Sequence, residues 1–388
     1  MRVTGYAYPW DVLDAPGFVD RAREVGVDEV AVALTYHTTR AATPWSPDRT
    51  AVLARHAALY RPVHEAAWEG ARMRPAAPDW MDGPDPGGDA VRALRSAGMP
   101  VTAWVVLTHN YRLGERYPDV AVRNCFGEQY PWALCPSSAE VREFAARLAG
   151  EATAGLDVSS VVLEACGQLG VAHQCHHEKT DAVWSPAAAR LLSVCCCDAC
   201  AKRWAAAGAD PREVRHRLRD EVRRLIASGS PSQTADRLCG ELSELLLATR
   251  QVASDELRAG VLAAVGGRGA RMVLHAAVDP WVTGALPGLT PTAAGEVDAV
   301  VLPCWQAGPA AVASVAAARG TLPEPVGVGA YVTAVAANPV SDMAGYVTEL
   351  STAGADELHL YHLGLAGPAR SADMRTAAAT ARRCHIRE

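Results

Sequence analysis

The alternation of strand-like runs with helical segments is the feature that most constrains the fold of this chain. Eight short runs are rich in apolar and β-branched residues, and a segment of helical pattern follows each of them. The strands are predicted at residues 2–8, 29–35, 100–107, 158–163, 272–278, 297–302, 326–332 and 357–361. The helices are predicted at residues 18–25, 89–97, 138–153, 186–264, 292–296, 310–318, 342–353 and 372–383.

Most of these predicted strands are continuously apolar, which indicates a parallel sheet that is buried on both faces. Eight β/α units are the number that closes a (β/α)8 TIM barrel. A doubly wound open sheet is the alternative, but its usual glycine-rich first turn is replaced here by Tyr6–Trp10. We therefore expect an α/β protein with a single (β/α)8 barrel domain over residues 1–388. A mostly helical insertion is expected at about residues 186–264, after the fourth strand.

The composition indicates a globular chain and argues against several kinds of partner. Apolar residues make up 49% and charged residues 21% of the 388 residues, so a sizeable core can form. The net charge of -6 and the lack of a basic run argue against nucleic acid, which needs clustered Lys and Arg. We find no run of roughly 18 uncharged apolar residues and no signal segment before the first strand. We expect a cytoplasmic protein with a small-molecule partner and no membrane partner, and the sequence is compatible with a homo-oligomer.

The C-terminal ends of the predicted strands carry an unusual number of aromatic and polar side chains. In barrel enzymes the reacting groups lie at these ends and on the loops after them. The candidates are Tyr6, Tyr8, Trp10, Tyr36, His37, His109, Asn110, Glu164, His275, Asp279, Trp281, Trp305, Tyr331 and His362. Aromatic rings suit the C–H faces of sugars, although a single tryptophan is more often part of a core.

Eleven cysteines occur in the chain, and three of them form the pattern Cys195-x-Cys197-x-x-Cys200. Three thiolates on one short turn can surround a tetrahedral cation, and Zn²⁺ is the natural occupant. Cys135 is the leading fourth ligand, because the loops after the third and fourth strands are neighbours in a barrel. Cys175 or one of His173, His176 and His177 are alternatives, and the thiols could also simply fill space. A site of four thiolates would be structural.

The segment Leu134–Arg142, with Cys135 in it, and the Cys195-x-Cys197-x-x-Cys200 group together resemble the zinc-cluster pattern of family 42 β-galactosidases. The resemblance covers about residues 100–205. It implies a glycoside-hydrolase-like TIM barrel of the large retaining clan, a structural zinc held by these four cysteines, and chemistry on a carbohydrate or glycoside.

The same resemblance gives Glu164 the place of the acid/base carboxylate, at the end of the fourth strand. A glycosidase needs a second carboxylate across the scissile bond. The chain departs from the family pattern in two places: Leu163 replaces an Asn, and the seventh strand ends at Tyr331 without the expected nucleophilic Glu. Asp279 is the best substitute, with Glu178 and Asp181 as others. Glu164 could alternatively be a buried ion-pair partner without a catalytic role.

The loop His173–Glu178 is rich in imidazoles, and its residues His176, His177 and Glu178 are candidates for binding substrate. It could also serve as a proton shuttle or as a second metal site. Three functions are therefore compatible with the sequence. The first is a glycoside hydrolase that uses Glu164 and Asp279. The second is a metal-dependent hydrolase or lyase that uses this loop, and the third is a non-catalytic sugar-binding barrel.

Overall fold

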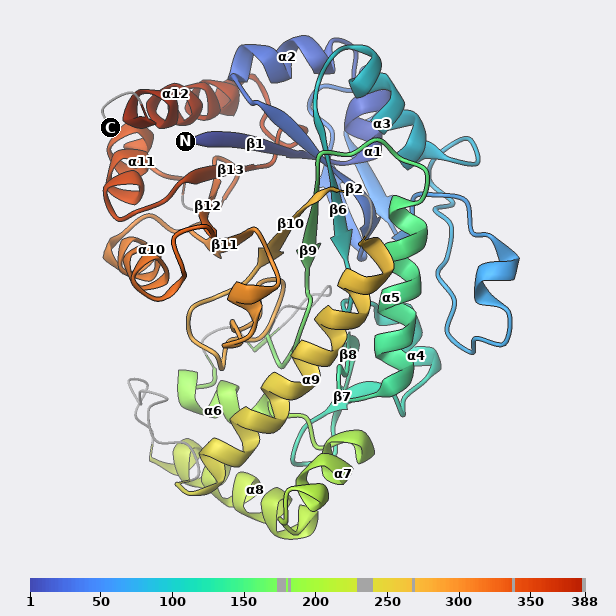
Figure 1. The fold of residues 1–388 in the computed structure, drawn as a ribbon, viewed down its shortest axis with the longest axis vertical. Helices are drawn as coiled ribbons and strands as arrows, with labels where there is room; N and C mark the ends of the chain where they lie inside the picture. The colour runs from blue at the N-terminus through green and yellow to red at the C-terminus, as the bar shows by residue number, and fades with distance from the viewer. Residues whose placement is uncertain (173–178, 181–182, 229–239, 267–268, 337–338, 386–388) are drawn as a thin grey trace.

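Eight parallel strands close into a barrel in the computed structural model, which describes residues 1–172, 179–180, 183–228, 240–266, 269–336 and 339–385 (Figure 1). The barrel strands are β1 (Arg2–Ala7), β2 (Glu29–Tyr36), β6 (Val101–Val106), β9 (Ser160–Glu164), β10 (Arg271–His275), β11 (Ala299–Pro303), β12 (Gly327–Thr333) and β13 (Glu357–Tyr361). Each pairs with the next in this order, and β1 pairs with both β13 and β2, which closes the ring. The predicted (β/α)8 barrel is confirmed.

Helices cover the outside of the barrel. They are α2 (Phe18–Val25), α3 (Pro86–Ser96), α5 (Ala139–Thr153), α9 (Leu242–Val265), the short 3-10 helix η2 (Ala293–Gly295), α10 (Pro309–Thr321), α11 (Met343–Thr352) and α12 (Pro368–His385). The longer of these helices bury an apolar face against the barrel. In α5, for example, Val141, Phe144, Ala145 and Leu148 are spaced as one helical face and are buried.

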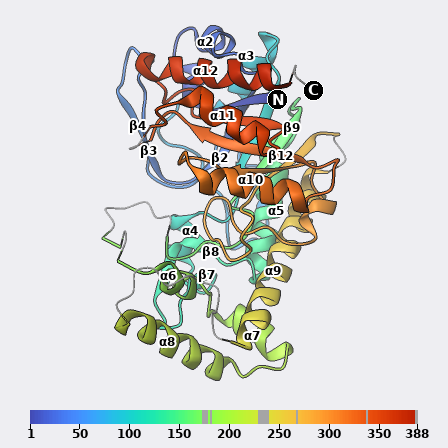
Figure 2. The same cartoon turned by 90° about the vertical axis from the view of Figure 1, so that its left-hand side faces the viewer.

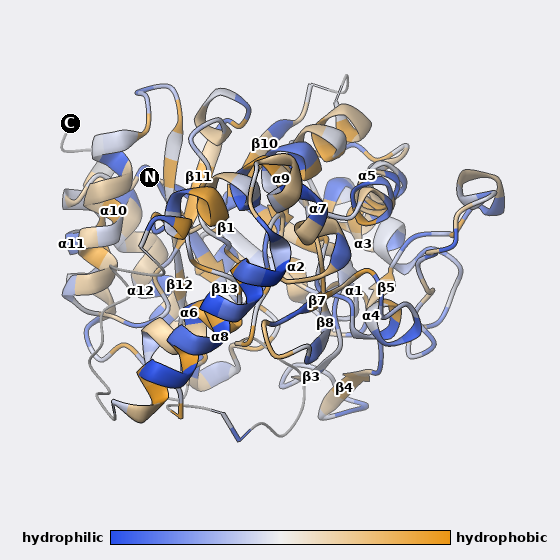
Figure 3. Cartoon of the chain, turned by 90° about the horizontal axis from the view of Figure 1, so that it is seen from below, coloured by the Kyte–Doolittle hydropathy of each residue, from blue (hydrophilic) through white to orange (hydrophobic). Residues whose placement is uncertain are grey.

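The segment between β9 and β10 contains α6 (Pro186–Leu192), α7 (Asp198–Ala206) and α8 (Pro211–Ala227) before α9. These three helices lie below the barrel in Figures 1 and 2, beyond the end of β9. One face of α8 is apolar, and its residues Val214, Leu218, Val222 and Leu225 are buried while the rest of the helix is largely hydrophilic (Figure 3). From there α9 returns along α5.

Small residues let α9 approach α5 closely. A Cβ placed on Gly150 of α5 would lie 3.5 Å from the Cβ of Ala264, and one on Gly260 of α9 would lie 3.8 Å from the Cβ of Ala146. Both are ordinary van der Waals distances. The helix pair therefore packs with little space between the two backbones.

Several short elements occupy regions that the sequence pattern treats as loops. They are α1 (Pro9–Leu13), the hairpin β3 (Thr39–Ala42) and β4 (Ala51–Ala54), β5 (Ala58–Leu59), the 3-10 helix η1 (Glu65–Trp68), α4 (Tyr111–Arg116), and the hairpin β7 (Ala121–Arg123) and β8 (Gln129–Leu134). Most of these elements are too short for a periodic pattern to identify them. Among the described helices, none is both long enough and apolar enough to cross a lipid bilayer.

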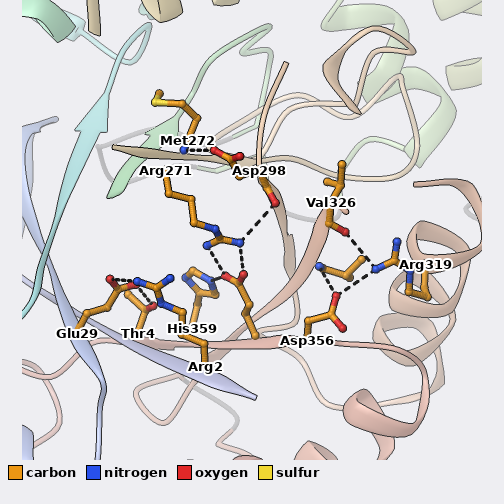
Figure 4. Close-up of polar contacts among 12 residues, drawn as sticks. Arg2, Thr4, Glu29, Arg271, Met272, Asp298, Arg319, Val326, Asp356 and His359 are labelled. Atoms are coloured by element: carbon orange, nitrogen blue, oxygen red, sulfur yellow. Dashed lines mark hydrogen bonds and ion pairs between the residues drawn. The ribbon is translucent and has the colours of Figure 1, made fainter. Parts of the chain in front are cut away.

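The interior of the barrel is polar at the end where the strands begin. Arg2 donates to Glu29 at 2.7 Å, and Arg271 donates to Glu357 at 3.1 Å. Figure 4 shows the Arg271 guanidinium beside the His359 ring in this layer. Buried charges of this kind are tolerated only when they are paired. The two ion pairs therefore close the end of the barrel where the strands begin, and both carboxylates there are paired.

Candidate active site

Glu164 is the last residue of β9 and its side chain points into the barrel. The carboxylate is buried, and its Oε2 accepts a hydrogen bond from Trp104 Nε1 at 2.9 Å. His275, the last residue of β10, places its Nδ1 3.3 Å from the same oxygen. The strand register explains this contact, because Leu274 pairs with Leu163 and so brings the two following residues side by side. The Trp104 hydrogen bond therefore orients the carboxylate, and His275 lies beside it at ion-pair distance, with no hydrogen bond at its Nδ1 among the described residues.

The chain turns sharply immediately after Glu164. Ala165 has a φ of 52°, in the left-handed region that side chains with a Cβ rarely adopt. Two contacts hold it there: its N–H donates to Ala285 O at 2.8 Å, and its carbonyl accepts from Thr108 Oγ1 at 2.7 Å. Strained backbone of this kind is frequent at functional sites.

Tyr6 lies at the centre of the barrel and links two histidines. Its hydroxyl is 2.8 Å from His275 Nε2 and 3.0 Å from His359 Nδ1. Burial lowers the pKa of His275, so this ring is neutral near pH 7. Burial also raises the pKa of Tyr6, and the nearby carboxylates of Glu164, Glu29 and Glu357 raise it further. Tyr6 is therefore a phenol that can donate one hydrogen bond and accept others.

Aromatic rings surround Glu164 and the Tyr6 hydroxyl. Tyr8 packs edge-on against Tyr36 with ring centroids 4.9 Å apart, and its hydroxyl is 3.4 Å from that of Tyr361. Tyr331 lies 4.7 Å from Tyr6 and 5.7 Å from Tyr361, again between centroids. Burial raises the pKa of all of these tyrosines. The upper barrel is thus lined by neutral phenols, which can donate hydrogen bonds but carry no charge.

Two further titratable groups lie beside this aromatic wall. His362 is fully buried and stacks 4.2 Å from Tyr8, and burial lowers its pKa to about 3. Its Nδ1 is 3.7 Å from Asp11 Oδ2, on α1. Burial raises the pKa of Asp11 to about 7, although its hydrogen bond from the Tyr8 N–H opposes this shift.

Four other predicted site residues make packing or helix-capping contacts, which account for their positions without a role in substrate binding. Trp10 is buried and stacks on Tyr8 at 4.4 Å, and Asn110 caps α4 by accepting from Leu113 N at 3.0 Å. His37 stacks on Tyr36 at 4.2 Å and lies 4.1 Å from the His109 ring. Their role in substrate binding stays a prediction.

Asp279 lies on the loop after β10 and is bound by Arg190 of α6. Its side chain is 42% exposed, and its second oxygen accepts from Trp281 N at 3.0 Å. The Trp281 ring lies beneath two guanidinium groups, Arg190 at 6.0 Å and Arg250 at 5.1 Å. Asp279 is thus held by partners other than those of Glu164. Trp305 is 37% exposed and lies 5.9 Å from Tyr331.

Four candidates from the imidazole-rich loop and its surroundings lie outside the described residues. They are His176, His177, Glu178 and Asp181, and the same is true of the alternative metal ligands His173 and Cys175.

Cys135, Cys195, Cys197 and Cys200 form a buried cluster in which all four sulfur atoms lie within 4.8 Å of one another. Cys135 Sγ is 3.6 Å from Cys200 Sγ and 3.7 Å from Cys197 Sγ. Four thiolates around a tetrahedral Zn²⁺, with Zn–S bonds of about 2.3 Å, have sulfur atoms about 3.8 Å apart. The donor set and its spacing therefore fit such an ion. The expected convergence of Cys135 on the other three cysteines is confirmed.

The surroundings of the cluster also suit bound thiolates. Ser137 Oγ lies 3.2 Å from Cys200 Sγ, and the Arg123 N–H donates to Cys195 Sγ at 3.5 Å. Hydrogen bonds from the other three cysteines lower the pKa of the Cys197 thiol, while the pKa values of Cys195, mainly through burial, and of Cys200, mainly through its hydrogen bond with Cys135, are raised, so one thiol of the four is favoured as a thiolate without an ion. The cluster joins the turn before α5 to the segment that enters α7, so it connects the loops of the third and fourth barrel strands.

The inner face of β13 was not anticipated as part of the site. Glu357, His359 and Tyr361 alternate with Leu358 and Leu360, which are buried in the outer core. That alternation of polar and apolar residues is visible in the sequence and predicts that the polar side chains share one face. Trp104 on β6 is another site residue that was not among the candidates. It is the one aromatic residue in a strand of otherwise small and aliphatic side chains.

No protein-family model matches this sequence, and no curated protein matches it. Among solved structures, the chain is similar to α-L-fucosidase isoenzyme 2 from Paenibacillus thiaminolyticus, with a TM-score of 0.56 and 12% identity over 98% of this chain. It spans 49% of that fucosidase chain. The glycoside hydrolase domain of PgaB (BpsB) from Bordetella bronchiseptica matches with a TM-score of 0.56 and 14% identity, over 97% of this chain and 98% of that one.

The catalytic domain of β-amylase from Paenibacillus polymyxa gives a TM-score of 0.54 at 10% identity, over 97% of both chains. The chain has the TIM-barrel fold of these glycoside hydrolases. At such low identity the likeness shows the fold alone.

Proposed function

We propose that this protein is a glycoside-hydrolase-like enzyme that acts on a small carbohydrate or glycoside, with Glu164 as the acid/base residue. The observation that carries the proposal is the position of Glu164: a buried carboxylate at the C-terminal end of a barrel strand, oriented by a hydrogen bond from Trp104 and 3.3 Å from His275 Nδ1. As an acid its carboxyl would protonate the glycosidic oxygen, and as a carboxylate it would activate water.

The surroundings of Glu164 support a sugar as the ligand. Tyr8, Tyr36 and Tyr331 are buried around Glu164 and Tyr361 is half-buried, so the barrel there is lined by apolar rings with hydroxyl groups, and pyranose rings present the complementary C–H faces and hydroxyls. Asp279, on the loop that follows the neighbouring strand β10, is the proposed second carboxylate and is held by Arg190.

Replacing Glu164 with Gln tests the proposal. On a panel of α- and β-linked nitrophenyl glycosides, we expect kcat to fall by about 10²–10⁴ for any glycoside that the wild type cleaves. Glu151→Gln is the matched control. Glu151 is also a buried glutamate that accepts from a tryptophan, Trp68, and contacts a histidine, His64 at 3.0 Å, but it lies on α5 outside the barrel. Equal turnover in the wild type and Glu164→Gln would remove Glu164 from the mechanism.

A non-catalytic sugar-binding barrel is the second candidate. It is favoured by the end of β12, where Tyr331, Val332 and Thr333 stand and no carboxylate does. A sugar that binds to the wild type and is recovered intact after long incubation would support this candidate over the hydrolase.

We further propose that the four-cysteine cluster binds a structural zinc, as in the family 42 β-galactosidases that its pattern resembles. Cys135→Ser should lose the metal and lower the free energy of unfolding by about 3 kcal/mol or more, since structural zinc contributes directly to folding. Cys196→Ala is the control, because the buried Cys196 adjoins the cluster in sequence but is not part of it. Atomic emission spectroscopy measures the metal, and unchanged zinc in Cys135→Ser would contradict the proposal.

The same metal assay addresses a metal-dependent hydrolase or lyase that would use the His173–Glu178 loop. More than one tightly held ion per wild-type chain would favour that mechanism over the carboxylate mechanism.

A further inference from the structure

A continuous series of hydrogen-bonding groups runs through the barrel from Glu164 to the charged layer at its other end. Five side chains from four strands take part. Three of the four contacts are hydrogen bonds, and the fourth, between Glu164 and His275 Nδ1, is at ion-pair distance, with no hydrogen bond at Nδ1 among the described residues. The distances are 3.3 Å from Glu164 Oε2 to His275 Nδ1, 2.8 Å from His275 Nε2 to the Tyr6 hydroxyl, 3.0 Å from that hydroxyl to His359 Nδ1, and 3.2 Å from His359 Nε2 to Glu357 Oε2. All five side chains are buried.

These five groups admit two arrangements that contain the same number of protons. In the first, Glu164 is a neutral acid that donates to His275, His275 donates to Tyr6, and Tyr6 donates to a neutral His359. In the second, Glu164 is a carboxylate, and His359 is an imidazolium that donates to both Tyr6 and Glu357. In both arrangements every contact of the series has one donor and one acceptor.

We propose that His275, Tyr6 and His359 form a proton relay that switches Glu164 between its acid and carboxylate forms, with His359 as the buried proton acceptor. This inference rests on the proposed function, since it supplies the two protonation states that an acid/base residue requires. His275 is a positioning residue in this scheme as well as a link in the relay.

The transfer is balanced without any external partner. The Oε2–H bond of Glu164 breaks as Nδ1–H of His275 forms, and Nε2–H of His275 breaks as a new O–H of Tyr6 forms. The original O–H of Tyr6 breaks as Nδ1–H of His359 forms. Three protons move by one position each, and no proton is exchanged with solvent. The net result is one unit of positive charge on His359 and one of negative charge on Glu164.

Glu357 makes His359 the natural end of the relay. Burial alone would raise the pKa of Glu357, but the hydrogen bond from His359 and the Arg271 guanidinium together lower it to about 2. Glu357 is therefore a carboxylate, which stabilises an imidazolium beside it. His275 has no such neighbour at its Nε2, and burial lowers its pKa, so it passes a proton on instead of keeping it.

The neighbouring strand β12 has glycines where it faces His359, the proton acceptor of the relay. A Cβ on Gly329 of β12 would lie 3.0 Å from His359 Nε2 and 2.8 Å from Val301 Cγ2. A Cβ on Gly327 would lie 2.8 Å from Glu357 Oε1. Both are closer than real Cβ contacts. Other polar or charged side chains near the relay include Arg2, Thr4, Glu29, Tyr36, Trp104, Arg271, Tyr331 and Tyr361.

The test is ¹⁵N NMR of the full chain labelled on histidine, which reports the protonation of each ring nitrogen. We expect Glu164→Gln to shift the His359 ring resonances. In a Tyr6→Phe background the same change should shift them at least threefold less, because the phenyl ring cannot pass a proton. Tyr331→Phe is the matched control: its ring packs against both Tyr6 and His275, but its hydroxyl has no hydrogen-bond partner among the described residues, so the coupling should persist.

Two results would overturn the relay. One is a His359 spectrum that does not respond to Glu164→Gln. The other is an equal response with Phe at position 6, which would mean that the coupling is electrostatic and acts through space. Neither result depends on a measurement of turnover. If Glu164→Gln loses activity but does not shift the His359 resonances, the proposed function is supported and the relay alone is refuted.

A second variant keeps the proposal testable if Tyr6→Phe does not fold. Glu357→Gln removes the charge that stabilises the imidazolium, so Glu164 should be more protonated at neutral pH. Infrared spectroscopy should then show an added carboxylic acid C=O band, beyond the one that Asp11 gives in the wild type, and this added band should disappear in the Glu164→Gln, Glu357→Gln double variant. No such band would contradict the relay.

Discussion

Glu164 and Glu151 are two buried glutamates with the same kinds of neighbours in very different surroundings. Each accepts a hydrogen bond from a tryptophan indole and contacts a histidine Nδ1. The His64 side chain beside Glu151 is 65% exposed, whereas His275 beside Glu164 is fully buried and its other nitrogen contacts Tyr6. Water can replace His64 at Glu151, whereas the described residues leave no part of the His275 side chain exposed to solvent. Glu151 also accepts from the His64 backbone N–H, whereas His275 gives Glu164 only a side-chain contact and is itself linked to Tyr6, so the two carboxylates differ both in their direct contacts and in what lies behind them.

The largest difference should appear when the two histidines are removed. We expect His275→Ala to lower the free energy of unfolding by about 3 kcal/mol, because it leaves a buried cavity and removes one hydrogen bond of the Tyr6 hydroxyl and one contact of the Glu164 carboxylate. His64→Ala should cost under about 1 kcal/mol, since solvent takes its place. Urea unfolding measures both values, and similar costs would remove the distinction between the two glutamates.

Adding a methyl group to a glycine should lower the stability of the protein in the barrel interior near Glu164 and raise it on α5 near Glu151. Gly329→Ala places a Cβ 2.8–3.0 Å from Val301 and His359, and overpacking of this kind costs about 1–3 kcal/mol. Gly150→Ala, next to Glu151, places a Cβ at 3.5 Å from Ala264 within a helix, where alanine is preferred by about 0.5–1 kcal/mol. Thermal unfolding of the two variants checks the signs, and a stable Gly329→Ala protein would mean that the barrel interior is loosely packed.

Acid should weaken the contribution of His275. Its pKa is lowered by burial, so the stability that the neutral ring provides is fully present above the unfolded value near 6.5 and is lost as the pH falls below it. The difference in stability between the wild type and His275→Phe should therefore shrink below pH 6.5, by at most about 1.4 kcal/mol per pH unit. Urea unfolding at a series of pH values measures it, with His64→Phe as the reference. A constant difference would indicate that His275 is charged in the folded protein.

The smallest effect on stability is expected at Asp279. Its ion pair with Arg190 is partly exposed, so Asp279→Asn should cost about 0.5 kcal/mol. If Asp279 is the second carboxylate, turnover should nevertheless fall by about 10² or more. Parallel measurement of unfolding and of glycoside cleavage separates the two roles, and unchanged turnover would leave Glu164 in need of another partner.

The barrel strands could be predicted because each is a local pattern of apolar residues. The cysteine cluster could be predicted for a related reason, since three of its members lie within six residues and Cys135 follows from the neighbouring loop. The hairpins β3–β4 and β7–β8 were missed, because strands of three to six residues show too little periodicity.

The contacts around Glu164 could not be predicted in the same way. Tyr6, His275 and His359 come from positions far apart in the chain, and they meet only because of the register between strands. Sequence reasoning placed Tyr6 and His275 at strand ends but not their pairing, and it selected His362 while passing over His359 and Tyr361. The pairing of Asp279 with Arg190 depends likewise on how α6 packs, which no local pattern specifies.

The two inward-facing glycines of β12 have a consequence for how this sequence can drift. Because Gly327 and Gly329 have no side chains, Glu357, Arg271 and His359 of the adjacent strands can occupy the space where a Cβ would lie. A larger residue at 329 is therefore acceptable only with a smaller one at 359. Among homologues we expect these two positions to co-vary, so that a barrel with a bulky seventh strand will have lost the eighth-strand histidine.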